Sequence, residues 1–307
     1  MSIFNDLTEL VKETDKLLKT VKKEEDEEEN QIAETEELLK ALENGKLTKK
    51  NIKELLQEEE QEVQESDQVV SQLTEATQMT EEQAQMFSKI LKKIHTQEEE
   101  TEQELSALEQ LVEQMSNQGV TAEAAKKAHE AVIDIGQNIM EEADELYKAG
   151  ELSEYIGRDI QELVSDETEA LEILKEQLNF TGEADRLMES AGISSAGDEE
   201  EKLGQEEQKD GSKLEDDEEE TMRVVGEFGS EVEEGEAEVE ELGDEADELE
   251  TLAGEVQQME EGTPEDDSDT MGEAAEITEE AKDKAIKAGD EFDTAASEAS
   301  NAKDAAP

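Results

Sequence analysis

Apolar residues recur along most of this chain at alternating spacings of three and four residues. One such register runs from Ala84 and Phe87 through Leu91 and Leu108 to Met115, with polar residues in it at 98–102. This spacing places apolar side chains on one face of an α-helix, which must then pack against other helices. Only 2% of the residues are aromatic, so Leu, Ile, Val and Ala have to build the core. The pattern predicts an all-α fold, an elongated antiparallel bundle or coiled coil with Leu91 and Leu108 in its core.

Turn signals divide the first part of the chain into helices. Gly45, Gly119 and Gly150 each follow an apolar series and are soon followed by a Thr or Ser that can cap the next helix. Thr80 and Gln83 have the spacing of a capping box. The predicted helices cover residues 2–44, 48–78, 80–117, 121–148 and 153–180. Loops this short join antiparallel neighbours, so we expect residues 1–190 to form one long-helix bundle.

The sequence changes character after residue 190. Residues 191–217 are rich in Gly, Ser and Glu without an apolar register, and they predict an acidic flexible linker. Residues 218–261 regain the register but contain five glycines, each costing about 1 kcal/mol relative to Ala, so they predict a weakened acidic helix. Residues 262–307 predict a second linker and a marginal Ala-rich helix with a frayed end. The bundle is therefore expected to carry an acidic, partly helical C-terminal tail.

The chain is strongly acidic, with 93 Asp and Glu against 27 Lys and Arg and a net charge of −66. In dilute buffer this charge opposes any compact state, whereas near 1 M salt the Debye length is only about 3 Å. The composition therefore indicates a salt-adapted, halophilic cell; an acidic interaction protein from a dilute cytosol is the alternative. Nucleic acid is excluded as a direct partner, because a phosphate backbone requires a basic face.

The sequence contains no pattern typical of an enzyme. Cys is absent, which excludes thiolate nucleophiles and Cys-based metal sites. The glycines after residue 190 are scattered and form no phosphate-binding loop. No apolar run approaches the roughly 18 residues of a transmembrane helix, and the N-terminus lacks the pattern of a signal peptide. We therefore expect a non-enzymatic, cytoplasmic protein without a cofactor.

One group of residues suggests a cation site. The apolar register lapses at residues 24–29, 58–62 and 98–102, and turns near 45 and 79 would bring these three acidic stretches to one level of the bundle. Carboxylates from several helices can bind hard cations, and an imidazole lies one turn before Glu99. The candidate ligands are Glu28, Glu59, His95, Glu98 and Glu99. The simpler interpretation is that the bundle is merely solvated at this level.

A second group is a basic face on the N-terminal helix. Lys12, Lys16, Lys19 and Lys23 occupy outer positions of its register. They could dock on an anionic membrane surface or on the acidic tail of the chain itself. Alternatively, they pair with acidic residues one turn away and form an ordinary solvated face.

Together these patterns predict a non-enzymatic coiled-coil interaction or scaffold protein of a salt-adapted cell. It would bind protein partners, or associate with itself, through its helices. The two alternatives are a peripheral membrane-associated protein that docks through its N-terminal helix, and a carboxylate-rich helical bundle that binds cations.

Overall fold

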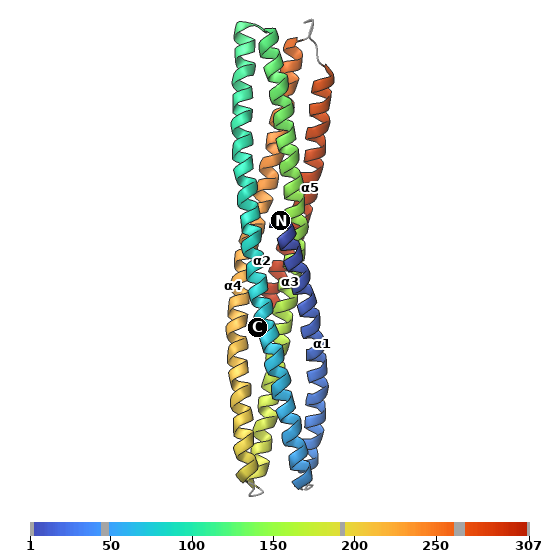
Figure 1. Cartoon of the computed structure of the whole chain (residues 1–307), viewed down its shortest axis with the longest axis vertical. Helices are drawn as coiled ribbons and strands as arrows, with labels where there is room; N and C mark the ends of the chain where they lie inside the picture. Colours follow the sequence, from blue (N-terminus) through green and yellow to red (C-terminus); the bar gives the residue numbers. More distant parts are fainter. Residues whose placement is uncertain (1–2, 44–48, 191–193, 261–267, 306–307) are drawn as a thin grey trace. The chain divides into compact units, whose positions relative to one another are not determined.

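The computed structural model describes residues 3–43, 49–190, 194–260 and 268–305, and nearly all of them are helical (Figure 1). The five helices are α1 (Ile3–Glu43), α2 (Lys49–Gln118), α3 (Ala122–Ser190), α4 (Ser194–Glu260) and α5 (Ser268–Ala305). No strand occurs among these residues, so the predicted all-α fold is confirmed. Within the same ranges, no helix has a stretch long and apolar enough to cross a bilayer.

The chain is divided into two compact units. Unit 1 consists of Met1–Thr8, Ala84–Gly157 and Phe228–Glu298, and unit 2 of Glu9–Gln83, Arg158–Glu227 and Ala299–Pro307. Helices α2, α3 and α4 therefore contribute one part to each unit, while α5 lies mainly in unit 1 and α1 mainly in unit 2. Each unit contains long segments of four helices.

In unit 1, consecutive helices run antiparallel. Lys93 of α2 pairs with Glu145 of α3, while the later Glu104 accepts a hydrogen bond from the earlier Asn138. The core of this unit includes three buried rings: Phe87 lies 5.7 Å from Phe228 and 6.3 Å from Phe292, measured between ring centroids. The predicted core residues Leu91 and Leu108 are buried here, with 3% and 1% of their surface exposed.

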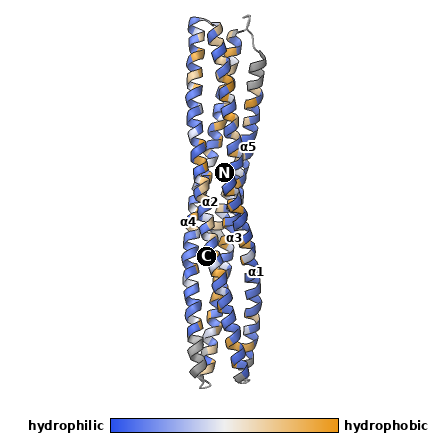
Figure 2. Ribbon diagram, viewed as in Figure 1, coloured by the Kyte–Doolittle hydropathy of each residue, from blue (hydrophilic) through white to orange (hydrophobic). Residues whose placement is uncertain are grey.

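In unit 2, the same antiparallel order holds. Gln83 of α2 donates to Thr14 of α1, and the earlier Glu62 accepts from the later Thr35. Two apolar clusters fill the core of this unit: a larger one that includes Leu18, Leu73 and Leu163, and a smaller one around Leu55. Figure 2 shows the same pattern as short apolar bands on otherwise hydrophilic helices.

Two of the predicted helix breaks are absent. Helix α2 continues through residue 79 and α3 through residue 150. The Thr80 hydroxyl donates to the Thr77 carbonyl, and the Ser153 hydroxyl to the Gly150 carbonyl, so both side chains bond within a helix instead of starting one. Gly150 permits close packing: a Cβ there would lie 3.0 Å from the Ala288 carbonyl oxygen of α5.

The loop at residues 119–121 is where the sequence predicts it. Gly119 has a φ of +87°, a conformation that glycine adopts without strain, and its N–H donates to the Met115 carbonyl. The Thr121 hydroxyl accepts a hydrogen bond from the Ala124 N–H and caps α3. The expected turns near residues 45 and 262 lie outside the described residues.

The flexible linker predicted over 191–217 is wrong for residues 194–217, which belong to α4. Leu214 is completely buried in the larger apolar cluster of unit 2, and Glu207 and Asp210 precede it at inner positions of the same helix. The helical register is therefore present, but carboxylates such as Glu207 and Asp210 occupy inner positions where an apolar register would have apolar residues. Because α4 and α5 supply helices to the units, residues 1–190 do not account for the bundle alone.

Candidate cation-binding site

Buried carboxylates occupy many inner positions of these helices. Those in unit 2 with less than a tenth of their surface exposed are Glu25, Glu28, Glu59, Glu62, Asp159, Asp166, Glu167, Glu207 and Asp210. In unit 1 the corresponding residues are Glu98, Glu142 and Glu245. Removing a carboxylate from water disfavours its charged form, so each such position needs a hydrogen-bond donor, a cation or a proton.

At several positions a threonine from a neighbouring helix supplies the donor. The Thr101 hydroxyl lies 2.6 Å from Glu142, and Thr221 and Thr77 both donate to Glu167, at 2.7 and 3.0 Å. Burial still dominates: it raises the pKa of Glu142 to about 7 and that of Glu167 to about 8, although the hydrogen bonds oppose the shift. The inner faces are thus joined by hydroxyl–carboxyl pairs as well as by apolar contacts.

One cluster in unit 1 combines carboxylates with an imidazole. His95 and Glu98 lie one turn apart on α2, and Glu238 and Glu241 lie one turn apart on α4. The His95 Nδ1 atom is 3.0 Å from Glu238 Oε1 and 3.4 Å from Glu98 Oε2. One donor atom from each of the four side chains lies within 4.8 Å of the others. We call these four residues the His95 cluster.

The surroundings of the cluster are strongly acidic. Burial raises the pKa of the Glu98 carboxyl, and the neighbouring Glu238 and Glu241 carboxyls raise it further. A groove of about 420 Å³ adjoins the cluster, and its lining is one imidazole and seven carboxylates: His95, Glu98, Glu99, Glu102, Glu241, Asp244, Glu245 and Glu248. Such a donor set can accept a cation through oxygen and nitrogen atoms.

The structure assembles part of the site suggested by the sequence. His95 and Glu98 belong to the cluster, and Glu99 lies beside it, with its Oε1 atom 3.8 Å from His95 Nε2. Glu28 and Glu59 are buried in unit 2, so the expected meeting of all three acidic stretches is wrong. Its premise was a turn near residue 79, where α2 is continuous.

Sequence reasoning missed the two members of the His95 cluster on α4. Glu238 and Glu241 lie in a run of glutamates with no feature that separates them from their neighbours. Only the parallel pairing of α2 with α4 in unit 1, seen also in the contact between Phe87 and Phe228, places them opposite His95.

The four lysines predicted at outer positions of α1 are exposed to solvent. These lysines are Lys12, Lys16, Lys19 and Lys23. Lys19 pairs with Asp15 at 2.6 Å and Lys23 with Glu27 at 2.8 Å, each one turn away on the same helix. These two ion pairs are of the kind that the solvated-face interpretation predicts.

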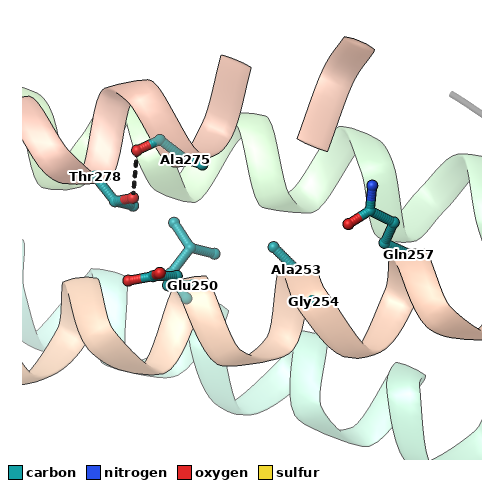
Figure 3. Close-up of a pocket in the computed structure, with 7 residues that line it drawn as sticks. Glu250, Ala253, Gly254, Gln257, Ala275 and Thr278 are labelled. Atoms are coloured by element: carbon teal, nitrogen blue, oxygen red, sulfur yellow. Dashed lines mark hydrogen bonds between the residues drawn. The ribbon is translucent and has the colours of Figure 1, made fainter. Parts of the chain in front are cut away.

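Figure 3 shows a small open pocket between α4 and α5 in unit 1. Small side chains, among them Ala253 and Ala275, form much of its wall. The Thr278 hydroxyl donates to the Ala275 carbonyl at 3.1 Å, and Glu250 accepts from Lys282 at 2.9 Å (Figure 3 draws the first of these). Thr278 and Glu250 at this pocket are thus engaged in contacts within unit 1.

No protein-family model and no curated protein matches this sequence. Among solved structures, the chain is similar to a de novo designed helical repeat protein at 14% identity, with 88% of this chain and 99% of that chain covered and a TM-score of 0.18. A structure from the computational design of self-assembling cyclic homo-oligomers is similar at 15% identity, with 97% and 99% covered and a TM-score of 0.15. At these scores the similarity concerns helical structure alone, and the functional conclusions rest on this chain's own residues.

Proposed function

We propose that this protein is a non-enzymatic scaffold of a salt-adapted cytoplasm. In this proposal it binds protein partners, or further copies of itself, through the outer faces of its helices. The observation that carries the proposal is the length of α2, α3 and α4, which contain 70, 69 and 67 residues. Helices of this length offer a long, regular surface on which several partners can bind at once.

The distribution of charge supports the salt-adapted part of the proposal. The outer faces carry most of a net charge of −66, and carboxylates also occupy inner positions of both units. Repulsion between these groups weakens as the salt concentration rises, whereas apolar contacts such as those around Leu73 are not weakened by screening. A bundle of this composition is therefore suited to concentrated salt.

The proposal is tested by sedimentation and cross-linking of the purified full chain in multimolar KCl, alone and after incubation with extract from its native cell. We expect either a defined oligomer or a complex of fixed stoichiometry whose cross-links fall on outer positions of the helices. A chain that stays monomeric and gives no stoichiometric complex would contradict the scaffold proposal. Flotation with anionic liposomes in the same salt separates it from the membrane alternative, because a scaffold of this kind should stay unbound.

A further inference from the structure

We propose that the His95 cluster is a binding site for a divalent transition-metal ion of the Mn²⁺ or Zn²⁺ type. Its ligands would be His95 and Glu98 from α2 and Glu238 and Glu241 from α4. The inference stands on this one cluster in unit 1 and is independent of the scaffold proposal.

The positions of the donor atoms fit a shared ion. Oxygen and nitrogen ligands lie about 2.0–2.2 Å from such a metal, so two ligands of one ion are roughly 3–4.4 Å apart. The His95 Nδ1 atom lies 3.0 Å from Glu238 Oε1 and 3.4 Å from Glu98 Oε2. All four side chains can present an atom within 4.8 Å of the others, so small rotations suffice to surround one ion.

The state of Glu98 gives a second, independent reason. Only 8% of this residue is exposed, and no hydroxyl or amide among the described residues donates a hydrogen bond to its carboxyl oxygens. The groups that face these oxygens are His95 Nδ1, 3.4 Å from Oε2, and the carboxyls of Glu238 and Glu241. The Oε2 atom of Glu238 is also buried without a hydrogen bond from the described part of the chain. A buried carboxylate left in this state costs free energy, and a bound cation would remove that cost.

The same unit shows what a purely structural buried carboxylate looks like. Glu142 is buried to a similar degree and receives a hydrogen bond of 2.6 Å from Thr101. Among the described residues, no hydroxyl takes that role at Glu98; the groups that converge there are His95, Glu238 and Glu241, whose side chains are of types that can bind a metal ion. Other buried carboxyls of the described residues, such as that of Glu25, also lack donors, so what distinguishes Glu98 is the convergence of an imidazole and two further carboxylates on it.

The donor set also narrows the class of ion. Carboxylates alone suit Mg²⁺, Ca²⁺ and Mn²⁺, whereas an imidazole adds affinity for transition metals. Potassium is singly charged and gains less from three carboxylates at one point. The acidic groove beside the cluster raises the local concentration of cations, and the imidazole then favours a transition metal over Mg²⁺.

The experiment uses the full chain in multimolar KCl, freed of metal with a chelator. Mn²⁺ is added, and free and bound Mn²⁺ are measured by electron paramagnetic resonance. We expect one saturable site per chain, with electron spin-echo modulation from a coordinated imidazole nitrogen and little displacement by an equal concentration of Mg²⁺. Many weak, equivalent sites without a nitrogen signal would overturn the proposal, since they would show only a diffuse ion atmosphere.

Variants identify the ligands. His95→Gln and Glu241→Gln change exposed residues, so both should fold, and each should weaken Mn²⁺ binding about tenfold to a hundredfold. Glu28→Gln is the matched control: it neutralises a buried carboxylate in unit 2 and should leave Mn²⁺ binding unchanged. Equal Mn²⁺ affinity in wild type and His95→Gln, or a loss in Glu28→Gln as large as in His95→Gln, would overturn the assignment.

Discussion

Single inner positions decide how tightly these helices pack. Leu91 is 3% exposed and lies in the register that runs from Ala84 to Met115, in the part of α2 that belongs to unit 1. Truncating such a side chain removes its contacts and leaves a cavity, because the surrounding helices relax only partly. The stability of unit 1 therefore depends on individual apolar residues between layers of polar ones.

Leu91→Ala and Leu108→Ala should each destabilise the protein by about 2–5 kcal/mol. Denaturant unfolding in multimolar KCl measures this change in the free energy of unfolding. Ile286→Ala is the control, since Ile286 is 64% exposed and its truncation should change stability by less than about 0.5 kcal/mol. Equal effects at Leu91 and Ile286 would show that the register is misassigned.

Two glycines of α4 should respond in opposite ways to replacement by alanine. A Cβ at Gly235 would lie 2.6 Å from the buried ring of Phe292, whereas a Cβ at Gly243 meets nothing within 4 Å. Gly243→Ala should stabilise the protein by up to about 1 kcal/mol through helix propensity. Gly235→Ala should destabilise it by about 1–3 kcal/mol through overpacking. Thermal melts of the two variants measure these changes in stability. Stabilisation by both substitutions would contradict the close contact between Gly235 and Phe292.

At the scale of the helix, apolar spacing predicts the all-α fold correctly but does not predict that α2, α3 and α4 are continuous. The pattern of Leu91 and Leu108 could be recognised because the residues at inner positions are apolar. At Glu207 and Asp210 the inner residues are carboxylates, so the sequence predicts a linker where the structure has a helix. For the same reason the sequence indicated His95 and Glu98 but gave no ground for choosing Glu238 among its many acidic neighbours.

The carboxylates at inner positions should make stability fall as the pH rises. Burial raises the pKa of Asp166 to about 7, of Glu167 to about 8 and of Glu25 to about 9. The folded state thus holds these protons more tightly than the unfolded state. The stabilisation is fully present near the ordinary carboxyl pKa and is lost progressively as the pH rises through 7 to 9.

Melting temperatures between pH 5 and pH 9 in constant multimolar KCl measure this dependence. Glu167→Gln should flatten it, because the amide removes one of the groups that take up a proton on folding. A melting temperature that rises with pH would contradict the raised pKa values of these buried carboxyls.

At the scale of the whole molecule, charge governs stability. With 93 acidic residues against 27 basic ones, repulsion opposes folding unless salt screens it. The two units share this property, since both contain buried carboxylates as well as acidic outer faces.

Helicity and melting temperature should therefore rise steeply between dilute buffer and multimolar KCl. Circular dichroism in both conditions measures the difference. Sodium chloride at the same ionic strength is the control, because screening alone predicts equal effects of the two salts. A fully helical protein with the same melting temperature at low salt would contradict the adaptation to salt.

The division of the helices between the units determines which unit can fold first during synthesis. Long segments of four helices of unit 2 are complete once the ribosome has passed Glu227, although the short Ala299–Pro307 segment joins later. Unit 1 still requires Phe228–Glu298, which includes most of α5. The parts of α2 and α3 that belong to unit 1 therefore cannot pack until the unit 1 segments of α4 and α5 are synthesised. The parts that belong to unit 2 can already pack. Nascent chains released near residue 227 should contain one folded half and one pair of helices with unprotected apolar faces.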